Sequence, residues 1–215
     1  MSVLLSEVEI TNRLQAAYQP GKSLKTDGVA ETTTLSSNLQ LKCAAVLLPL
    51  VRKDSSWHMI FTRRTDSVES HKGQVSFPGG GCNDSETRAE QTALREAQEE
   101  IGLSPQDVQI LGRLNDVVTI THFRVTPVVG VIPWPYEFQL SQHEVSRVFS
   151  IPLQWMAEPG NWDEITFTPD GTRRSFRVIT YHVYDGEVLW GASARITHDF
   201  LEILGLISGQ GKIGE

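Results

Sequence analysis

Three glutamates, Glu96, Glu99 and Glu100, stand at the spacing i, i+3 and i+4 within residues 87–101. Small apolar residues recur there every four positions, which predicts an amphipathic helix capped at its C-terminal end by Gly102. On a helix this spacing places the three carboxylates on one face, where they repel one another. A bound divalent cation would turn that repulsion into coordination, and oxygen ligands suit Mg²⁺ or Mn²⁺. A solvated acidic surface is the competing interpretation.

A run of glycines, Gly79 to Gly81, follows Phe77-Pro78 shortly before this helix. The run predicts the end of a short strand and a turn, because glycine permits unusual backbone angles and lets a ligand approach the main chain. Arg95 lies four residues before Glu99 and can also reach towards the helix start. The glycines, the glutamate spacing and the arginine together favour a metal site over a solvated surface.

Composition limits the classes of function. The chain has 215 residues, a formal net charge of −7 and 40% hydrophobic residues, which predicts a globular protein with a sizeable core. An acidic chain is a poor candidate for nucleic-acid binding, which needs clustered basic residues. The longest apolar run, residues 44–51, is too short to span a bilayer. We therefore expect neither a nucleic-acid nor a membrane partner.

The cysteines and histidines predict no further site. Cys43 and Cys82 are the two cysteines and form no CxxC pattern, so neither a disulfide nor a cysteine-based zinc site is expected. The composition fits a reducing compartment, and we expect a cytoplasmic protein. Cys82 is interpreted as small filler in the glycine turn. The six histidines show no HxxxH or other ligand spacing, and His198 is expected to be ordinary.

The remaining chain predicts mixed strands and helices rather than regular βαβ alternation. An α+β or layered α/β/α domain with a mixed sheet follows from that order. We divide the chain into a helix with a connector (1–38), a main domain (39–207) and a tail (208–215). The expected helices cover 7–17, 87–101 and 192–206, and the expected strands cover 41–51, 57–63, 74–77, 108–114, 117–121, 124–132, 144–149 and 176–184.

Residues 95–103, REAQEEIGL, resemble the second half of the Nudix box, REUxEExGU, in which U is a bulky or aliphatic residue. The first half, GxxxxxE, matches Gly80 with Glu86 and leaves a spacer of eight residues where seven are usual. Alignment on Gly81 removes the extra residue but puts Thr87 at the glutamate position, so we prefer the insertion. The resemblance implies the Nudix fold, an α+β protein built as an α/β/α sandwich with a mixed β-sheet.

The insertion also resembles the coenzyme A diphosphatase branch of this family. Residues 60–80, IFTRRTDSVESHKGQVSFPGG, fit most of its upstream motif, LLTxR(S/A)xxxRxxxGxxxFPGG. Thr65 replaces the Ser or Ala, and Glu69 replaces an Arg, which reverses the charge. Segments at 116–132, 144–153 and 181–196 also resemble that branch. Glu69 keeps other diphosphate substrates open, and Lys72 is a candidate for supplying the positive charge instead.

The resemblance implies hydrolysis, dependent on Mg²⁺ or Mn²⁺, of the diphosphate bond of coenzyme A or acyl-coenzyme A. The products would be 3′,5′-ADP and (acyl-)phosphopantetheine. A second hypothesis keeps the chemistry but takes ADP-ribose, a dinucleotide or a nucleoside triphosphate. A third is a non-catalytic Nudix-fold binding module. The expected partner is a small nucleoside diphosphate derivative of the coenzyme A type, and a homodimer is an oligomeric state to test.

Roles for individual residues follow from the same resemblance. The implied metal ligands are Glu96, Glu99, Glu100 and the main-chain carbonyl of Gly80, with Glu96 and Glu99 also counted as catalytic. Arg95 is expected to act indirectly, by pairing with Glu86 and joining helix to loop.

Other candidates lie outside the box. Glu144 is a candidate for a base or an extra ligand, against the alternative of an ordinary loop glutamate. Arg63, Arg64 and Lys72 are candidates for binding substrate phosphates, against the alternative of a solvated strand end.

Overall fold

The structure is a computed structural model that describes residues 5–25, 41–65, 73–168 and 175–207. Its helices are α1 (Glu7–Ala17), α2 (Ala89–Ile101), the short 3₁₀ helix η1 (Pro105–Asp107), α3 (Leu153–Ala157) and α4 (Gly191–Ile203). Its strands are β1 (Ser23–Lys25), β2 (Lys42–Lys53), β3 (Ser56–Arg64), β4 (Val75–Ser76), β5 (Gly79–Gly81), β6 (Gln109–Arg113), β7 (Asp116–Val118), β8 (Phe123–Val131), β9 (Val145–Pro152), β10 (Trp162–Phe167) and β11 (Phe176–Tyr181).

The central strand β2 is buried on both faces. Successive side chains of a strand point to opposite sides. Leu47 and Val51 accordingly join one core cluster, and Leu48 and Leu50 join another. Neighbouring β3 alternates in the same way between the two clusters. A near-continuous apolar run is what burial on both faces requires.

The main sheet is mixed, as the sequence predicts. Its strands run in the order β1-β7-β8-β2-β3-β4, with β5 also paired to β2, β6 to β8 and β9 to β3. β2 pairs in parallel with β8 and antiparallel with β3. Because β3 pairs only with residues 50–53 of β2, the glycine strand β5 lies beside residues 44–46 instead. This split in the sheet holds the glycine run next to β2.

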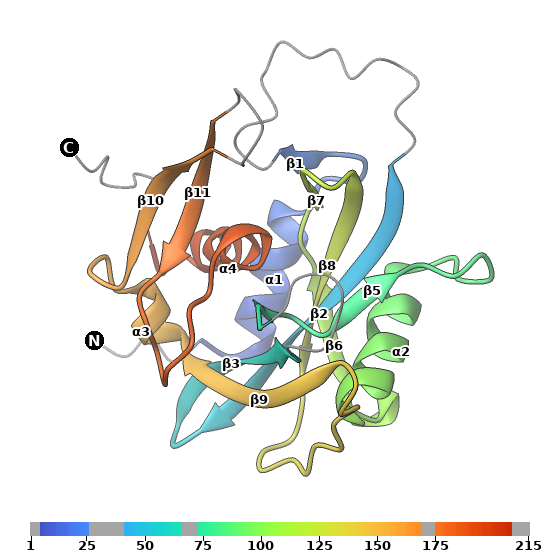
Figure 1. Cartoon of the computed structure of the whole chain (residues 1–215). Helices are drawn as coiled ribbons and strands as arrows, with labels where there is room; N and C mark the ends of the chain where they lie inside the picture. Colours follow the sequence, from blue (N-terminus) through green and yellow to red (C-terminus); the bar gives the residue numbers. More distant parts are fainter. Residues whose placement is uncertain (1–4, 26–40, 66–72, 169–174, 208–215) are drawn as a thin grey trace.

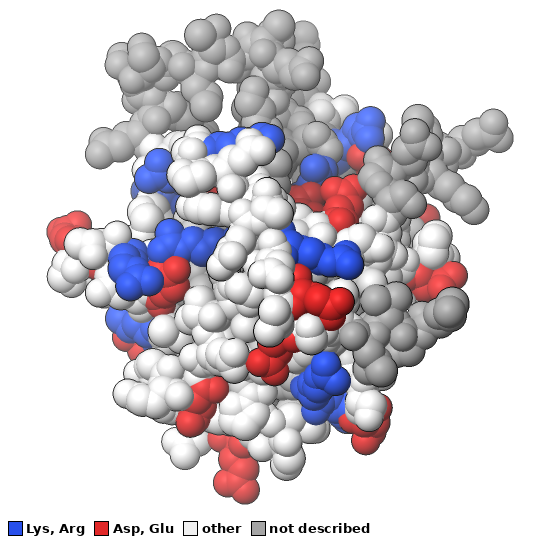
Figure 2. All heavy atoms as spheres, turned by 180° about the vertical axis from the view of Figure 1, so that it is seen from behind, with Lys and Arg blue, Asp and Glu red and all other residues white. Residues whose placement is uncertain are grey.

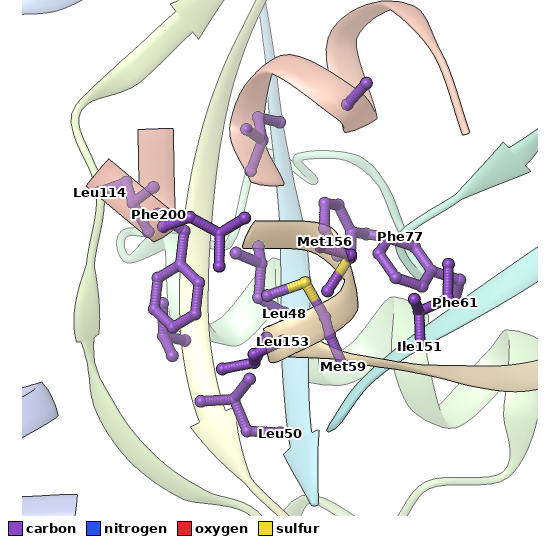
Figure 3. Packing of buried hydrophobic residues seen from close by; sticks show 14 of the residues in the cluster. Leu48, Leu50, Met59, Phe61, Phe77, Leu114, Ile151, Leu153, Met156 and Phe200 are labelled. Atoms are coloured by element: carbon purple, nitrogen blue, oxygen red, sulfur yellow. The ribbon is translucent and has the colours of Figure 1, made fainter. Parts of the chain in front are cut away.

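Helices cover both faces of the sheet (Figure 1). α2 packs on β2, β5 and β8 through Ala93, Ala97 and Ile101. The opposite face is covered by α1, α3 and α4 together with the hairpin β10–β11, and Phe200, Met156 and Leu48 pack there around one core (Figure 3). The expected α/β/α sandwich is therefore confirmed.

The N-terminal helix belongs to the same core. Ser6 caps α1 in a capping box with Glu9. Ile10 and Leu14 are fully buried, and Leu14 packs so closely on Gly112 that an added Cβ there would meet it at 3.2 Å. α1 thus covers β6. The division of the chain at residue 39 stays a prediction.

The element boundaries follow the sequence closely where periodicity is strong. α1 has the predicted bounds, and β3 is the antiparallel partner of β2 as predicted. Five elements, β1, β5, η1, α3 and β10, were not predicted. They are short, or lie in polar sequence without clear alternation, as in Trp162–Phe167 (WDEITF).

The surface carries mixed charge. On the face opposite to that of Figure 1, basic and acidic side chains are interspersed over the described residues (Figure 2). No helix in the described part of the chain is both long and apolar enough to cross a bilayer.

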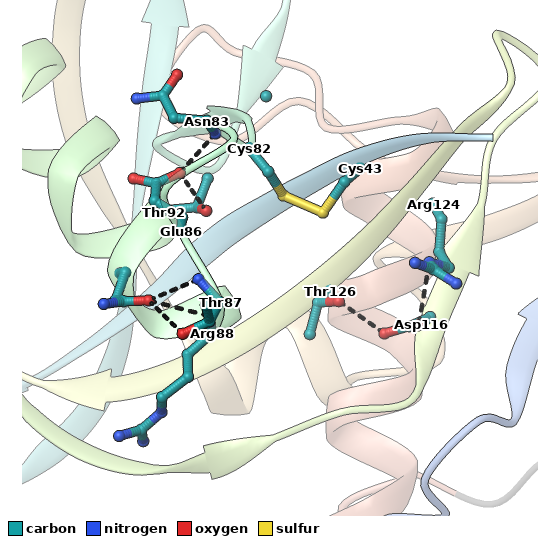
Figure 4. The surroundings of a disulfide bond; sticks show 12 residues. Cys43, Cys82, Asn83, Glu86, Thr87, Arg88, Thr92, Asp116, Arg124 and Thr126 are labelled. Atoms are coloured by element: carbon teal, nitrogen blue, oxygen red, sulfur yellow. Dashed lines mark hydrogen bonds and ion pairs between the residues drawn. A yellow bond between two sulfur atoms is a disulfide. The ribbon is translucent and has the colours of Figure 1, made fainter. Parts of the chain in front are cut away.

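One expectation is wrong: Cys43 and Cys82 form a disulfide (Figure 4). Cys43 is exposed on β2, and Cys82 directly follows β5, so the antiparallel pairing of these strands brings the two together. The main-chain N–H of Cys82 also donates to the carbonyl of Cys43 at 3.1 Å. Sequence spacing could not reveal this, because the pairing arises from strand register across 39 residues.

The disulfide should contribute measurably to stability. The double variant Cys43→Ser/Cys82→Ser is expected to lose about 2–4 kcal/mol of unfolding free energy, because the crosslink restricts the unfolded chain. Urea denaturation measures this. A dithiol reductant should lower the wild type to the level of the variant and leave the variant unchanged. Equal stability of the oxidised and reduced wild type would contradict the prediction.

Candidate functional site

Glycine is required in β5 because a side chain would not fit there, and not because the backbone adopts unusual angles. A Cβ on Gly79 would lie 2.5 Å from the carbonyl oxygen of Ala45, and one on Gly80 would lie 2.5–2.6 Å from the Glu96 carboxylate. The glycines with positive φ are found elsewhere in the described chain. The expectation of a turn at 79–81 is therefore wrong, whereas the expected close approach at the main chain is present.

Helix α2 presents the glutamates beside this strand. It begins at Ala89, two residues later than predicted, because the Gln91 side chain accepts from the main-chain N–H groups of Thr87 and Arg88. It ends as predicted at Gly102, which adopts the left-handed conformation at φ 67°.

Arg95 joins the helix to the glycine strand. Its Nε donates to Glu86 at 2.8 Å, and its Nη2 donates to the carbonyl of Gly81 at 2.9 Å. Its Nη1 lies 2.7 Å from Glu96 and 3.0 Å from Glu99. The predicted pairing of Arg95 with Glu86 is confirmed, and it supports the alignment that keeps Glu86. One guanidinium thus orients three carboxylates.

Glu86 is held as a charged acceptor. It accepts from the main-chain N–H of Asn83 at 2.8 Å and from the hydroxyl of buried Thr92 at 2.7 Å (Figure 4). The hydrogen bond from Arg95, with these two further bonds, lowers the pKa of Glu86 to about 2. Asn83 and Thr92 were not singled out from the sequence, because neither residue type nor spacing marks a partner of this kind.

Glu96 and Glu100 are in the opposite situation. Glu100 is 5% exposed, and burial raises its pKa to about 8. Its Oε2 accepts from the main-chain N–H of Gly79 at 3.3 Å. Burial raises the pKa of Glu96 as well. The charges of Glu99 and Glu144 raise the pKa of Glu96 further, and those of Glu96 and Glu144 raise the pKa of Glu100 further. Clustered, desolvated carboxylates of this kind lack sufficient positive charge.

The lack of positive charge beside these carboxylates, together with their donor atoms, shows which cation the site fits. The donor set is oxygen only, from Glu96, Glu99 and Glu100, and the carboxylates lie against the main chain at Gly79 and Gly80. Glu99 is the most exposed of the three, with 57% of its side chain accessible. A hard divalent cation would compensate the buried charges, so the residues fit Mg²⁺ or Mn²⁺.

The loop before β9 brings Glu144 to the same place. The last carbonyls of α2 accept from this loop: Ser141 N–H donates to Glu100 at 2.9 Å, and Gln139 N–H donates to Ile101 at 3.0 Å. The N–H of Glu144 donates to the carbonyl of Ser141 at 2.9 Å, which holds Glu144 beside the end of α2, and its charge contributes to raising the pKa of Glu96 and Glu100. Glu144 is exposed and remains accessible to a substrate.

The structure separates the two candidate arginines. Arg64 is close enough to Glu100 for its charge to lower the pKa of that carboxyl, against the larger effect of burial. Arg63 instead donates to Ser146 at 3.1 Å and lies 3.5 Å from Glu187, because neighbouring residues of a strand face opposite ways. Arg63 is thus not brought to the glutamates. Lys72 and Glu69 lie outside the described residues.

The titration of Glu100 predicts a pH-dependent stability without metal. The folded protein holds this proton up to about pH 8, whereas the unfolded chain releases it near the ordinary value of 4.5. The unfolding free energy therefore falls as pH rises between these values, by at most about 1.4 kcal/mol per pH unit from this group. Urea denaturation in chelator, at steps from pH 5 to pH 8, measures the slope.

Glu100→Gln is the matched variant, because its amide does not titrate. Its stability should fall less steeply over this range, and Mn²⁺ at pH 8 should stabilise the wild type more than the variant. Parallel pH curves for the two proteins would show that Glu100 is not the responsible group.

Comparison with known proteins places this geometry in a family. Residues 41–171 match the family model described as the NUDIX domain. A protein of Cronobacter sakazakii named "Uncharacterized Nudix hydrolase NudL" is 36% identical over 163 residues, covering 76% of this chain and 83% of that protein. The protein of the same name from Escherichia coli K12 is 35% identical over the same shares.

A solved structure extends the comparison. The NUDIX domain of Shewanella oneidensis NrtR, complexed with ADP ribose, is 18% identical and covers 66% of this chain and 82% of that one, with a TM-score of 0.41. The family model spans more than half of the chain, and the curated relatives share over a third of the aligned residues. The chain therefore belongs to the Nudix hydrolase family and is an enzyme that hydrolyses diphosphate-containing substrates.

Proposed function

We propose that the enzyme hydrolyses the diphosphate bond of coenzyme A or acyl-coenzyme A, giving 3′,5′-ADP and (acyl-)phosphopantetheine. The observation that carries the chemistry is the cluster of Glu96, Glu99, Glu100 and Glu144 against the glycine strand. The observation that favours the substrate is in the sequence, where residues 60–80 and the extended box resemble the coenzyme A diphosphatase branch.

Glu96, Glu99 and Glu100, with the carbonyl of Gly80, would hold Mg²⁺ or Mn²⁺. When bound, the cation neutralises diphosphate charge and makes phosphorus more open to attack. Arg95 keeps Glu96 and Glu99 oriented without needing to touch the substrate. The effect of the Arg64 charge on Glu100 supports a role for Arg64 in binding a substrate phosphate.

Glu144 is assigned the role of general base. Its carboxylate would accept a proton from the attacking water as the new phosphorus–oxygen bond forms and the bridging bond to the second phosphate breaks. Its exposure and its closeness to Glu96 and Glu100 support this role, because a base must reach the water and lie beside the reacting phosphorus.

Another diphosphate substrate is the second candidate, and Glu69 favours it. This residue stands where the coenzyme A diphosphatase branch has an Arg. An Arg there would attract the 3′-phosphate of coenzyme A, whereas the negative charge of Glu69 would not. ADP-ribose, dinucleotides and nucleoside triphosphates lack that 3′-phosphate. A non-catalytic module is less favoured, since the full carboxylate set is present.

A hydrolysis screen by mass spectrometry tests the substrate. With Mg²⁺ or Mn²⁺ we expect coenzyme A to be cut to 3′,5′-ADP at least tenfold faster than its form lacking the 3′-phosphate, ADP-ribose or NADH. Glu99→Gln should lose at least a hundredfold in kcat, because one metal ligand and one Arg95 contact are removed. Glu158→Gln, which removes an exposed charge far along the chain, is the control.

Each other result has a defined meaning. Equal rates on all diphosphates would reject specificity for coenzyme A but keep the hydrolase. Mn²⁺ binding without turnover of any substrate would reject catalysis and support a binding module.

The role of Glu144 has its own test. Glu144→Gln should lower kcat by about 10²–10⁴-fold, because proton transfer to the carboxylate is lost. Glu137→Gln is the matched control, since Glu137 is an exposed carboxylate of the same connecting segment. An unchanged kcat in Glu144→Gln would make Glu144 an ordinary loop residue.

A further inference from the structure

A second group of ligand-type side chains lies on α4, on the side of the sheet opposite α2. The potential ligand atoms of His198, Asp199 and Glu202 lie within 4.8 Å of one another. His198 and Asp199 are 7% and 5% exposed, and Glu202 is partly buried. The Nδ1 of His198 is 3.8 Å from Oε1 of Glu202. Among the described residues, no other three side chains of this kind, the α2 glutamates included, have ligand atoms this close together.

The hairpin β10–β11 covers this group. Trp162 and Tyr181 face each other across the hairpin, so both side chains stand on the same side of it. The Trp162 ring lies edge-on to His198 with the ring centroids 4.7 Å apart. Asp199 is close enough to Tyr181 for its charge to raise the pKa of the phenol, after burial itself. The α4 group therefore has an aromatic cover.

Several buried polar atoms at this place have no hydrogen-bond partner within the described ranges. They are Nδ1 of His198, the hydroxyl of Tyr181 and Nε1 of Trp162. A buried polar atom that stays without a partner destabilises the folded protein. Among them, Nδ1 of His198 is itself a potential ligand atom of the α4 group, and a cation bound there would take it as a ligand.

We propose that His198, Asp199 and Glu202 bind a divalent transition-metal cation, with Zn²⁺ the best match. One imidazole nitrogen with two carboxylates suits Zn²⁺ better than Mg²⁺ or Ca²⁺, which take oxygen ligands. Metal–ligand bonds of about 2.0–2.2 Å place neighbouring ligands roughly 3–3.5 Å apart, so a small contraction closes the site. Glu202 can supply it, because 35% of its side chain is exposed.

Charge favours a cation over water alone. Arg195 donates to Oδ1 of Asp199 at 2.9 Å, which orients that carboxylate and compensates one negative charge. The second carboxylate, on Glu202, has no arginine or lysine ion pair among those found in the described chain. The group is thus net negative where a cation would lie, and a bound cation would fasten α4 to the hairpin β10–β11.

The test uses the full chain with the α2 glutamates silenced by Glu96→Gln, Glu99→Gln and Glu100→Gln. We expect one equivalent of Zn²⁺ per chain after gel filtration, measured by elemental analysis, and a higher thermal midpoint with Zn²⁺. Co²⁺ should give visible d–d absorption that Zn²⁺ abolishes. These readouts do not depend on hydrolysis, so the site can stand or fall separately from the proposed function.

Two variants in that background locate the site. Glu202→Gln should weaken Co²⁺ binding at least tenfold, and His198→Gln should abolish the absorption band. Glu158→Gln removes an equal charge on the exposed surface and should change neither. Circular dichroism confirms folding, and the partly exposed Glu202 keeps the test valid where the buried His198 variant fails to fold.

The proposal is overturned by any of three results. The first is that the silenced chain binds no Zn²⁺. The second is that the Glu202→Gln and Glu158→Gln proteins bind Zn²⁺ equally well. The third is that a crystal grown with Zn²⁺ shows only water between His198 and Glu202.

Discussion

The Arg95 guanidinium is the interaction on which the active site depends. It joins three parts of the chain that the fold brings together independently: the helix α2, the glycine strand β5 through Gly81, and the intervening turn through Glu86. Glu86 stays charged because Asn83 and Thr92 also donate to it. Protonation therefore does not break its ion pair with Arg95 at neutral pH. A lysine could carry the charge but could not make these contacts at once, because it lacks the planar fork of donors.

The two ends of α2 are fixed in different ways. At its start, Gln91 accepts from the main chain of residues 87 and 88. At its end, the loop before β9 donates to the carbonyls of Glu100 and Ile101. The side chain of Glu100 turns back to Gly79, so the same residue contacts the loop through its main chain and the glycine strand through its carboxylate. Because that carboxylate is buried, its negative charge needs a compensating positive charge nearby.

Much of this arrangement is predictable from sequence because it is local. The spacing of Glu96, Glu99 and Glu100 and the cap at Gly102 follow from helix geometry within a short segment, and the family resemblance implies the pairing of Arg95 with Glu86. The layered fold follows from the order of mixed strands and helices, and the burial of β2 on both faces follows from its near-continuous apolar run. What could not be predicted depends on register between distant strands: the disulfide, the opposite directions of Arg63 and Arg64, and the meeting of α4 with Trp162 and Tyr181. Glycines 79–81 were assigned to a turn because glycine is known to permit unusual backbone angles, whereas the sequence does not show how closely the neighbouring backbone approaches.

The hydrogen bonds from Gln139 and Ser141 to the end of α2 have a consequence for how this enzyme can change. They tie the segment before β9 to the glutamate helix, and the main-chain N–H of Thr65 donates to the carbonyl of Glu144 at 3.0 Å, which ties the same segment to the end of β3. A substitution that shifts either the end of α2 or the end of β3 would therefore shift Glu144 relative to the other glutamates. An engineer seeking a new substrate would keep both connections and diversify residues outside them.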